Sequence, residues 1–308
     1  MSHPNNWVSN SRWAPDQIDD QSGRVAVITG ANSGIGYRVA LHMAEHGART
    51  VLACRDTAEG ARAAQRIADA VPDAATRVEE VDLADLCSVE HLAGRIAERG
   101  DRLDYLFNNA GVMMASNEKT AQGHEFHFGV NHLAHFVLTN RLLPTLMATP
   151  DSVIVTVSSY GHRWGGIDFD ALGARSAPGN ASKAYAQSKL ANLLFHYELD
   201  RRLTNARAPT RAVAAHPGRA RTELARHSRM LRLVQPLLSQ SADQGSWPLL
   251  YAATSPRAAA GKYYGPNGFL GLTGYPAEST ASPRARDPGA AGRLWDLSES
   301  LTGVTSGI

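Results

Sequence analysis

The chain has 308 residues, of which 43% are hydrophobic and 19% are charged, and its formal net charge is +2. This composition is typical of a globular protein with a sizeable buried core, and the small net charge, without a basic stripe, argues against nucleic acid as a partner. No run of 18 apolar residues occurs, so the sequence predicts no transmembrane segment.

Segments typical of strands and helices alternate along the chain from residue 24 onward. Short apolar runs rich in β-branched residues predict strands at Arg24–Thr29, Arg49–Ala53, Thr76–Val81, Leu103–Phe107, Val153–Val157 and Thr210–Ala215. Helical patterns lie between them, at Ile35–His46, Ala58–Ala70, Ser88–Arg99, Val130–Met147 and Ser182–Leu203. The strand runs lack polar alternation, which indicates strands buried on both faces of a parallel sheet.

Successive strand–helix–strand units also predict the arrangement of the sheet. Such units cross over in a right-handed sense, and a doubly wound sheet is then the simplest topology. We therefore expect one α/β domain of the Rossmann type, with a mainly parallel seven-stranded sheet flanked by helices. Residues 1–22 are expected to form an arm, residues 23–308 the domain, and residues from about 219 to 250 a cap inserted over the substrate site.

Within the expected cap, the segment Met230–Leu238 (MLRLVQPLL) is almost entirely apolar. It could be a lid over an apolar substrate or a helix of the core, and a contact with a membrane or with a second copy of the chain is an alternative. A helix this short would be a weak membrane anchor without further support.

The chain contains two cysteines, Cys54 and Cys87, which fall in segments predicted as a strand end and a helix start. A disulfide framework is therefore not expected, which favours a reducing, cytoplasmic location. The first 20 residues lack the basic-then-apolar order of a signal peptide. No metal site is predicted.

The first predicted strand runs into a glycine-rich turn, Thr29–Gly36 (TGANSGIG). Glycines at such a turn allow a sharp bend and expose backbone N–H groups at the start of the helix. A pyrophosphate placed there would meet the positive end of the helix dipole. We therefore predict that a dinucleotide coenzyme binds at Gly30, Asn32, Ser33, Gly34, Ile35 and Gly36.

The end of the second predicted strand indicates which dinucleotide binds. A carboxylate about 20 residues after the glycines would bind the ribose 2′-hydroxyl of NAD, whereas an arginine would bind the 2′-phosphate of NADP. Here Cys54 ends the strand and Arg55 follows, with a guanidinium suited to a phosphate. NADP(H) is favoured over NAD(H), although Asp56 could instead be the ribose-binding carboxylate.

Two further groups of residues suggest a site for chemistry at the carboxyl ends of the strands. Asn109, Ala110 and Gly111 follow the fourth predicted strand, where small and amide-bearing residues allow a ligand to approach the backbone. Tyr185 and Lys189 stand four residues apart on a predicted helix, so they share one face. A nearby ammonium group would lower the pKa of a phenol from about 10 toward neutral pH.

In this order, the motifs TGANSGIG, NNAG, Asn131, Ser158-Ser159 and YAQSK resemble the short-chain dehydrogenase/reductase family. The longer stretches VNHLAHFVLTNRLLP and SKLANLLFHYEL, followed by HPG and Thr222, resemble its retinol dehydrogenase-like branch, which includes the light-dependent protochlorophyllide reductases. The resemblance covers residues from about 13 to 305. Five motifs in one order are far more specific than any one of them.

The resemblance implies roles for four residues. Tyr185 would give a proton to the carbonyl oxygen in reduction, or take it from the alcohol in oxidation. Lys189 would lower the pKa of Tyr185 and hold the nicotinamide ribose, and Ser159, rather than Ser158, would hydrogen-bond the substrate oxygen. Asn131 would kink its helix and hold a water that connects Lys189 with solvent.

Further coenzyme contacts are implied by the same resemblance. Asp82 would bind the adenine amino group, although the sequence is equally consistent with a helix-capping role for this residue. Thr222 would bond the nicotinamide carboxamide. The complete set of expected coenzyme contacts adds Leu83, Tyr185, Lys189, Pro217 and Gly218 to the residues named above.

The sequence thus predicts an NADP(H)-dependent oxidoreductase that transfers a hydride between the nicotinamide and an apolar carbonyl or alcohol, such as an aldehyde or a retinoid-, steroid- or lipid-like molecule. Two alternatives stay open: C=C reduction, as in the protochlorophyllide reductases, and a regulator that binds NADP(H) without turnover. A homodimer or homotetramer could form through the two long predicted helices, unless the cap and the arm block that packing.

Overall fold

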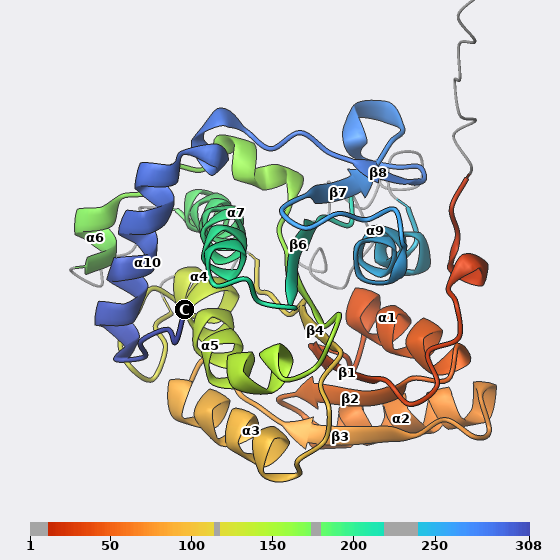
Figure 1. The fold of residues 1–308 in the computed structure, drawn as a ribbon. Coiled ribbons are helices and arrows are strands. Elements are labelled where there is room, and N and C mark those ends of the chain that lie inside the picture. The colour runs from red at the N-terminus through yellow and green to blue at the C-terminus, as the bar shows by residue number, and fades with distance from the viewer. Residues whose placement is uncertain (1–11, 114–117, 174–179, 219–239) are drawn as a thin grey trace, which may run out of the picture.

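The structure, a computed structural model, describes residues 12–113, 118–173, 180–218 and 240–308. In this part of the chain, eight strands form one sheet in the order β3-β2-β1-β4-β5-β6-β7-β8 (Figure 1). The strands are β1 (Val25–Thr29), β2 (Arg49–Cys54), β3 (Thr76–Glu80), β4 (Tyr105–Asn108), β5 (Val153–Val157), β6 (Arg211–Ala215), β7 (Tyr263–Pro266) and β8 (Pro276–Glu278). Neighbouring strands are parallel from β3 to β7, and β8 is antiparallel to β7. The Rossmann-type α/β fold is confirmed, with eight strands instead of seven because β8 adds a short edge strand.

Helices cover both faces of this sheet (Figure 1). They are α1 (Gly34–Glu45), α2 (Thr57–Ala70), α3 (Leu86–Glu98), α4 (Phe126–Phe128), α5 (Ala134–Met147), α6 (Phe169–Gly173), α7 (Ala181–Asn205), α9 (Ala242–Thr254) and α10 (Pro288–Thr302). Alternate residues of β1 show the two faces. Val25 and Val27 are buried with side chains of α3 and α5, whereas Ala26 and Ile28 are buried with those of α1, α2 and α9. Burial on both faces explains the absence of polar alternation in the strand sequences.

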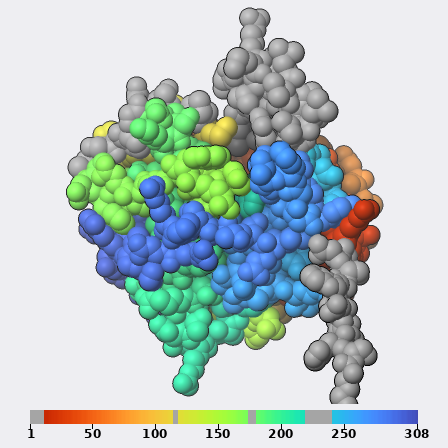
Figure 2. Space-filling view, turned by 90° about the horizontal axis from the view of Figure 1, so that it is seen from above, coloured from red at the N-terminus to blue at the C-terminus, as the bar shows by residue number. Residues whose placement is uncertain are grey.

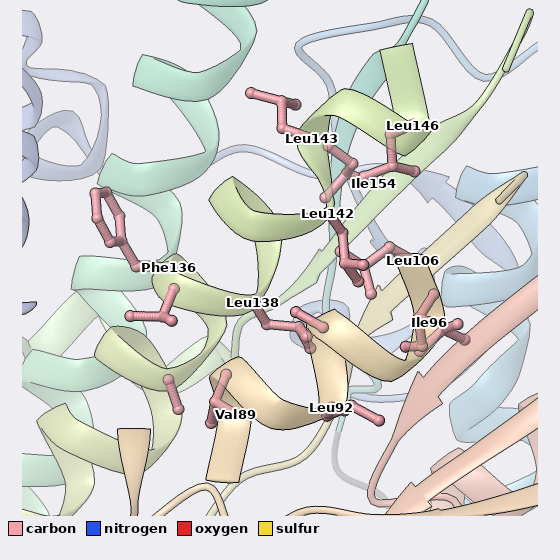
Figure 3. Close-up of a cluster of buried hydrophobic side chains, with 14 of the residues drawn as sticks. Val89, Leu92, Ile96, Leu106, Phe136, Leu138, Leu142, Leu143, Leu146 and Ile154 are labelled. Carbon is pink, nitrogen blue, oxygen red and sulfur yellow. The ribbon is translucent and has the colours of Figure 1, made fainter. Parts of the chain in front are cut away.

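The core between the sheet and the helices α3 and α5 is built from branched aliphatic side chains. Figure 3 shows Leu138 and Leu142 of α5 in the same cluster as Leu92 of α3 and Leu106 of β4, and all four are fully buried. Each such side chain contributes about 1.5 to 3 kcal/mol by leaving water. This packing holds α5, and with it the segment 129–133 that precedes it, against the sheet.

The C-terminal helix α10 covers part of α7 and α5. Its Trp295 is 1% exposed, stacks on Phe195 of α7 with 5.7 Å between ring centroids, and meets the edge of Phe136 of α5 at 5.1 Å. The guanidinium of Arg202 in α7 lies over the same indole, 4.4 Å from its centroid. The two long helices expected to pair in an oligomer are thus partly covered by the chain's own C-terminal helix.

The described part of the expected arm, residues 12–22, lies against the domain. Trp13 is buried, and its ring meets the edge of Tyr251 in α9 with 5.4 Å between centroids. An aromatic pair of this kind adds about 0.5 to 1.5 kcal/mol to the burial of its area. This part of the arm is therefore attached to α9.

The expected cap, residues 219–250, divides into two parts. Its later part lies in α9, whose Leu249 and Leu250 are buried on the same face of the sheet as α1, so it belongs to the helical layer. The earlier part, which contains the apolar segment Met230–Leu238, lies outside the described residues. Among the helices that the structure describes, none is long and apolar enough to cross a membrane.

Four buried histidines make the stability of the fold sensitive to acid. Burial lowers the pKa of His132 and His216 to about 3 and that of His135 and His196 to about 4. In the unfolded chain each ring has a pKa of about 6.5, so between pH 6.5 and 4 the unfolded state binds more protons than the folded state. We predict that the free energy of unfolding falls by several kcal/mol from pH 7 to pH 5, which urea titrations at each pH would measure.

A matched pair of variants isolates this effect. His132→Leu removes one buried ring and should reduce the number of protons taken up on unfolding at pH 5 by about one. His91→Asn changes an exposed ring and serves as the control. Equal stability of the parent chain at pH 5 and pH 7 would contradict the prediction.

Candidate active site

The turn between β1 and α1 is shaped for close approach of backbone to a ligand. Gly30 and Gly34 have φ angles of +66° and +58°, the left-handed conformation that favours glycine. A Cβ on Gly36 would lie 2.4 Å from the carbonyl oxygen of Gly30, so no larger residue fits there. The N-cap residue Ser33 makes no side-chain capping bond, which leaves the first N–H groups of α1 available to an anion.

A cleft of about 600 Å³ opens beside this turn, at the carboxyl ends of β1 to β4. Most of the residues predicted to bind the coenzyme line it: Gly30, Asn32, Ser33, Gly34, Ile35, Gly36, Arg55, Asp82, Leu83, Asn109, Ala110 and Gly111. Met113, Phe126 and Val130 add an apolar wall that no motif indicated. These three residues come from segments outside the regular sheet, whose position depends on the fold as a whole.

The remaining expected coenzyme contacts do not line this cleft or are not described. They are Tyr185, Lys189, Pro217 and Gly218, which lie elsewhere, and Thr222, which lies outside the described residues. The Pro217 carbonyl accepts a hydrogen bond of 2.6 Å from the side chain of Gln240. Gly218 has a φ of +66°, and a Cβ there would lie 2.4 Å from the carbonyl oxygen of Leu272. Both residues thus shape the chain after β6.

Arg55 and Asp56 follow β2 and both line the cleft, but they differ in their contacts. Arg55 is exposed. The carboxylate of Asp56 is the N-cap of α2, and its Oδ1 accepts a hydrogen bond of 2.9 Å from the backbone N–H of Glu59. Such a cap satisfies one of the unpaired N–H groups of a helix. One carboxylate oxygen of Asp56 therefore caps α2, whereas the exposed guanidinium of Arg55 lines the cleft.

The structure tests the helix-capping role considered for Asp82. Asp82 lines the cleft, and its Oδ1 accepts a hydrogen bond of 2.9 Å from the N–H of Ala84. The N-cap of α3 is Asp85, whose Oδ1 accepts from the N–H of Cys87 at 3.0 Å. The helix-capping role for Asp82 is therefore wrong, because α3 begins at Leu86 and its N-cap is Asp85.

Thr29, at the end of β1, holds the loop that follows β4. Its hydroxyl oxygen accepts hydrogen bonds of 3.0 Å from the N–H groups of Asn109 and Ala110, and the Asn109 amide donates back to the Thr29 carbonyl at 2.8 Å. The same hydroxyl lies 3.0 Å from Nε2 of His135, whose Nδ1 lies 3.0 Å from the carbonyl oxygen of Asn131. Sequence reasoning marked neither Thr29 nor His135 as a site residue, because their contacts join segments far apart in the chain.

Asn131 lies in a π-helical turn, Gly129–Leu133, directly before α5. Its amide nitrogen donates to the carbonyl of Val112 at 3.0 Å and to the hydroxyl of Ser188 at 2.9 Å, and its Oδ1 accepts from the N–H of Val112 at 2.7 Å. A π-turn is an interruption that often marks functional sites. The expected distortion of this helix is present, and it aims the side chain at the loop after β4.

Ser159 and Tyr185 meet beyond the end of β5. The Ser159 side chain lies close enough to the Tyr185 phenol to lower its pKa by hydrogen bonding. Ser158 is instead buried, and its hydroxyl donates to the backbone carbonyl of Lys189 at 2.7 Å. A Cβ on Gly161 would lie 3.4 Å from both the Ser159 hydroxyl oxygen and the Tyr185 ring. The structure therefore places the second serine of the pair, as expected, beside the tyrosine.

Burial governs the ionisation of Tyr185 and Lys189. It lowers the pKa of Lys189, which is 4% exposed, to about 8. It raises the pKa of Tyr185 above its ordinary value, while the hydrogen bond with Ser159 acts in the opposite direction. The Lys189 ammonium lies 5.9 Å from the centre of the Tyr185 ring. The lowering of the Tyr185 pKa that was expected from Lys189 is therefore wrong for the free protein, because the loss of water around the phenol outweighs the hydrogen bond with Ser159.

Gly111 connects the coenzyme cleft with these buried groups. It lines the cleft, and a Cβ on it would lie 3.2 Å from the Lys189 ammonium nitrogen and 3.2 Å from Oδ1 of Asn131. Lys189 also donates to the carbonyl of Val157 at 3.2 Å. The inner end of the cleft therefore meets Asn131 and Lys189 with only a glycine backbone between them.

The buried ammonium of Lys189 should lower the stability of the free protein. The folded pKa of about 8 lies below the unfolded value of 10.5, so the cost is fully present below pH 8 and disappears as the pH rises toward 10.5. We predict that Lys189→Met raises the free energy of unfolding by about 1 to 3 kcal/mol at pH 7, measured by urea titration without coenzyme. The Val157 carbonyl keeps a donor in this variant, because Asn192 also bonds it at 3.0 Å.

The gain from Lys189→Met should shrink at pH 9.5, where the native lysine is largely neutral in the folded state. Lys262→Met is the control, since Lys262 is exposed and pairs with Glu278. A variant that is less stable than the parent chain at pH 7 would show that packing, rather than charge burial, dominates at this position.

Comparisons with known proteins agree on one family, the short chain dehydrogenases. The sequence model of a family described as short chain dehydrogenase matches residues 24–231. Retinol dehydrogenase 13 of Homo sapiens is 40% identical over 293 residues, which cover 92% of this chain and 85% of that protein. Retinol dehydrogenase 12 of Homo sapiens is 40% identical over 287 residues, which cover 92% of this chain and 87% of that protein.

Solved structures are similar over most of the chain. An uncharacterised protein from Mycobacterium paratuberculosis has a TM-score of 0.82 and 39% identity, with 97% of this chain and 100% of that chain covered. A protein described as a short chain dehydrogenase of Escherichia coli CFT073, in complex with NADPH, has a TM-score of 0.64 and 25% identity, with 82% and 98% covered.

Proposed function

This chain belongs to the short chain dehydrogenase family, and from that premise we propose that it is an NADP(H)-dependent oxidoreductase acting on an apolar carbonyl or alcohol. The observation that carries the proposal is the meeting of Ser159, Tyr185 and Lys189 beside the inner end of a cleft that is shaped for a dinucleotide. Oxidoreductases of this family act on alcohol and carbonyl groups.

The residues of the cleft fit a nicotinamide dinucleotide. Gly36 leaves no room for a side chain beside Gly30, and the uncapped start of α1 offers N–H groups to a pyrophosphate. Gly111 would let the nicotinamide end approach Lys189 and Asn131. When bound, the coenzyme supplies or accepts the hydride. The protein's own residues bind it, orient the substrate and move the proton.

Tyr185 is the proposed proton donor in the direction of carbonyl reduction. Its raised pKa keeps the phenol protonated at neutral pH in the free protein. Ser159 hydrogen-bonds the phenol and can donate to the substrate oxygen, where negative charge develops. Once the proton has left, the Lys189 ammonium stabilises the phenolate through its charge. In alcohol oxidation the proton moves the other way.

A reaction panel tests the role of Tyr185. Tyr185→Phe should lower kcat at least about 100-fold while the Kd for NADPH changes little, because the phenol moves a proton and its ring is kept. Turnover would be followed at the nicotinamide absorbance band with a set of aldehydes and ketones, all-trans-retinal included. Tyr197→Phe, on the same helix, is the control and should keep the parent rate. Full activity of Tyr185→Phe would remove this residue from the proposed mechanism.

The preference for NADP(H) rests on Arg55. Its charge borders the cleft, whereas the neighbouring carboxylate of Asp56 caps α2. The relative from Escherichia coli CFT073 was solved with NADPH, which agrees with this assignment. The substrate class rests on the retinol dehydrogenases among the relatives, whose name refers to a long apolar alcohol.

Replacement of Arg55 should change the coenzyme preference. Arg55→Gln removes a charge-assisted contact with the 2′-phosphate and should raise the Kd for NADPH about 10- to 100-fold. The Kd for NADH, which lacks this phosphate, should stay the same, and fluorescence titration would measure both. Arg62→Gln is the control, since Arg62 is exposed on α2 and pairs with Glu59. Tighter binding of NADH than NADPH by the parent chain would overturn the assignment.

A further inference from the structure

The backbone of Ser159 is held by a buried histidine that the proposed mechanism does not use. His162 is 1% exposed, and its Nδ1 lies 2.7 Å from the carbonyl oxygen of Ser159. Its Nε2 lies 3.1 Å from the backbone nitrogen of Ser282. Ser282 is 120 residues away in the sequence, so the ring connects the end of β5 with a segment near the C-terminus.

These two contacts determine the proton position on the ring. A backbone carbonyl can only accept a hydrogen bond, and a backbone N–H can only donate one. His162 must therefore carry its proton on Nδ1, which donates to Ser159, and present a bare Nε2 to the N–H of Ser282. Burial lowers the pKa of His162, which agrees with a neutral ring. A second proton would place two N–H groups against each other at Ser282.

The loop that contains His162 is fixed at other points as well. Arg163 donates to the carbonyl of Thr280 at 2.5 Å, and Arg284 donates to the carbonyl of Gly165 at 3.1 Å. A Cβ on Gly165 would lie 2.4 Å from the carbonyl of Ala186, directly after Tyr185, so the loop packs tightly on α7. Figure 2 shows the C-terminal part of the chain, in blue, lying against the green middle part. Of these connections, the one through His162 reaches Ser159.

We propose that His162 is a positioning residue: it accepts a hydrogen bond from the Ser282 N–H, donates one to the Ser159 carbonyl, and so holds the Ser159 hydroxyl against Tyr185. This inference deepens the proposed function and rests on the roles given there to Ser159 and Tyr185. Three ionisable groups face the His162 ring. They are Arg163 in the same loop, Tyr263, whose ring centre lies 5.8 Å away, and His216, whose pKa a charge on His162 would lower.

Two substitutions of His162 separate a positioning role from a role in packing alone. His162→Leu removes both hydrogen bonds and should lower kcat about 10- to 100-fold, since a small misplacement of a reacting group has an effect of this size. The Kd for NADPH should not change, because His162 does not line the coenzyme cleft. His162→Gln keeps one N–H donor and one carbonyl acceptor, and should recover most of the lost rate. Thermal unfolding of each variant identifies any that fail to fold.

Ser282→Pro tests the same contact from the other side and leaves the histidine in place. Ser282 has φ of −62° and ψ of 154°, which proline adopts without strain. The substitution deletes the N–H that keeps Nε2 free of a proton, so the ring can be protonated as the pH falls. The value of kcat for carbonyl reduction should then fall further toward acid pH in this variant than in the parent chain. Ser306→Pro, near the C-terminus, does not touch this loop and serves as the control.

A spectroscopic measurement that needs no catalytic turnover tests the role of His162 independently of the proposed function. The ring signal of Tyr185 in a protein with labelled tyrosines, assigned with Tyr185→Phe, should shift in His162→Leu and return in His162→Gln. If the parent chain shows no turnover, the proposed function fails, and this signal still decides the role of His162. The inference is overturned by a folded His162→Leu variant with the parent kcat, by an unshifted Tyr185 signal, or by an unchanged pH profile in Ser282→Pro.

Discussion

The hydroxyl group of Thr29 joins the two halves of the candidate site. It accepts hydrogen bonds from the backbone of Asn109 and Ala110 and contacts His135, whose other ring nitrogen bonds the carbonyl of Asn131. The Thr29 hydroxyl oxygen thus connects the coenzyme turn with the loop after β4 directly, and with the π-turn before α5 through His135. Because these contacts end on backbone or on a buried ring, a shift at Thr29 would move both the coenzyme cleft and Asn131.

The buried ammonium of Lys189 lowers the stability of the folded state at neutral pH. Burial disfavours the charged form of both Tyr185 and Lys189, so the free protein holds a neutral phenol beside an ammonium whose pKa lies near 8. A lowered pKa such as that of Lys189 is typical of functional sites, where a reaction needs groups whose charge can change near neutral pH. The aliphatic core of α3, α5 and the sheet supplies the stability that makes such a site tolerable (Figure 3).

Elements with a strong local pattern could be predicted from the sequence. The expected strand Val153–Val157 coincides with β5, and the expected helix Ala58–Ala70 differs from α2 by one residue at its start. The strands β7 and β8 gave no such pattern, because YYGP and PAE are too short and contain proline. Their place at the edge of the sheet depends on pairing with β6 and with each other.

The motifs identified the coenzyme turn, the loop Asn109–Gly111 and the pair Tyr185 and Lys189 without a structure, because each is a pattern of neighbouring residues with a local chemical reason. The amino-acid order held no comparable signal for Thr29 or His162. Their partners, His135 and Ser282, lie 106 and 120 residues away along the chain. Burial is also a property of the folded state, and it reversed the direction expected for the Tyr185 pKa because the surrounding protein removes water from the phenol.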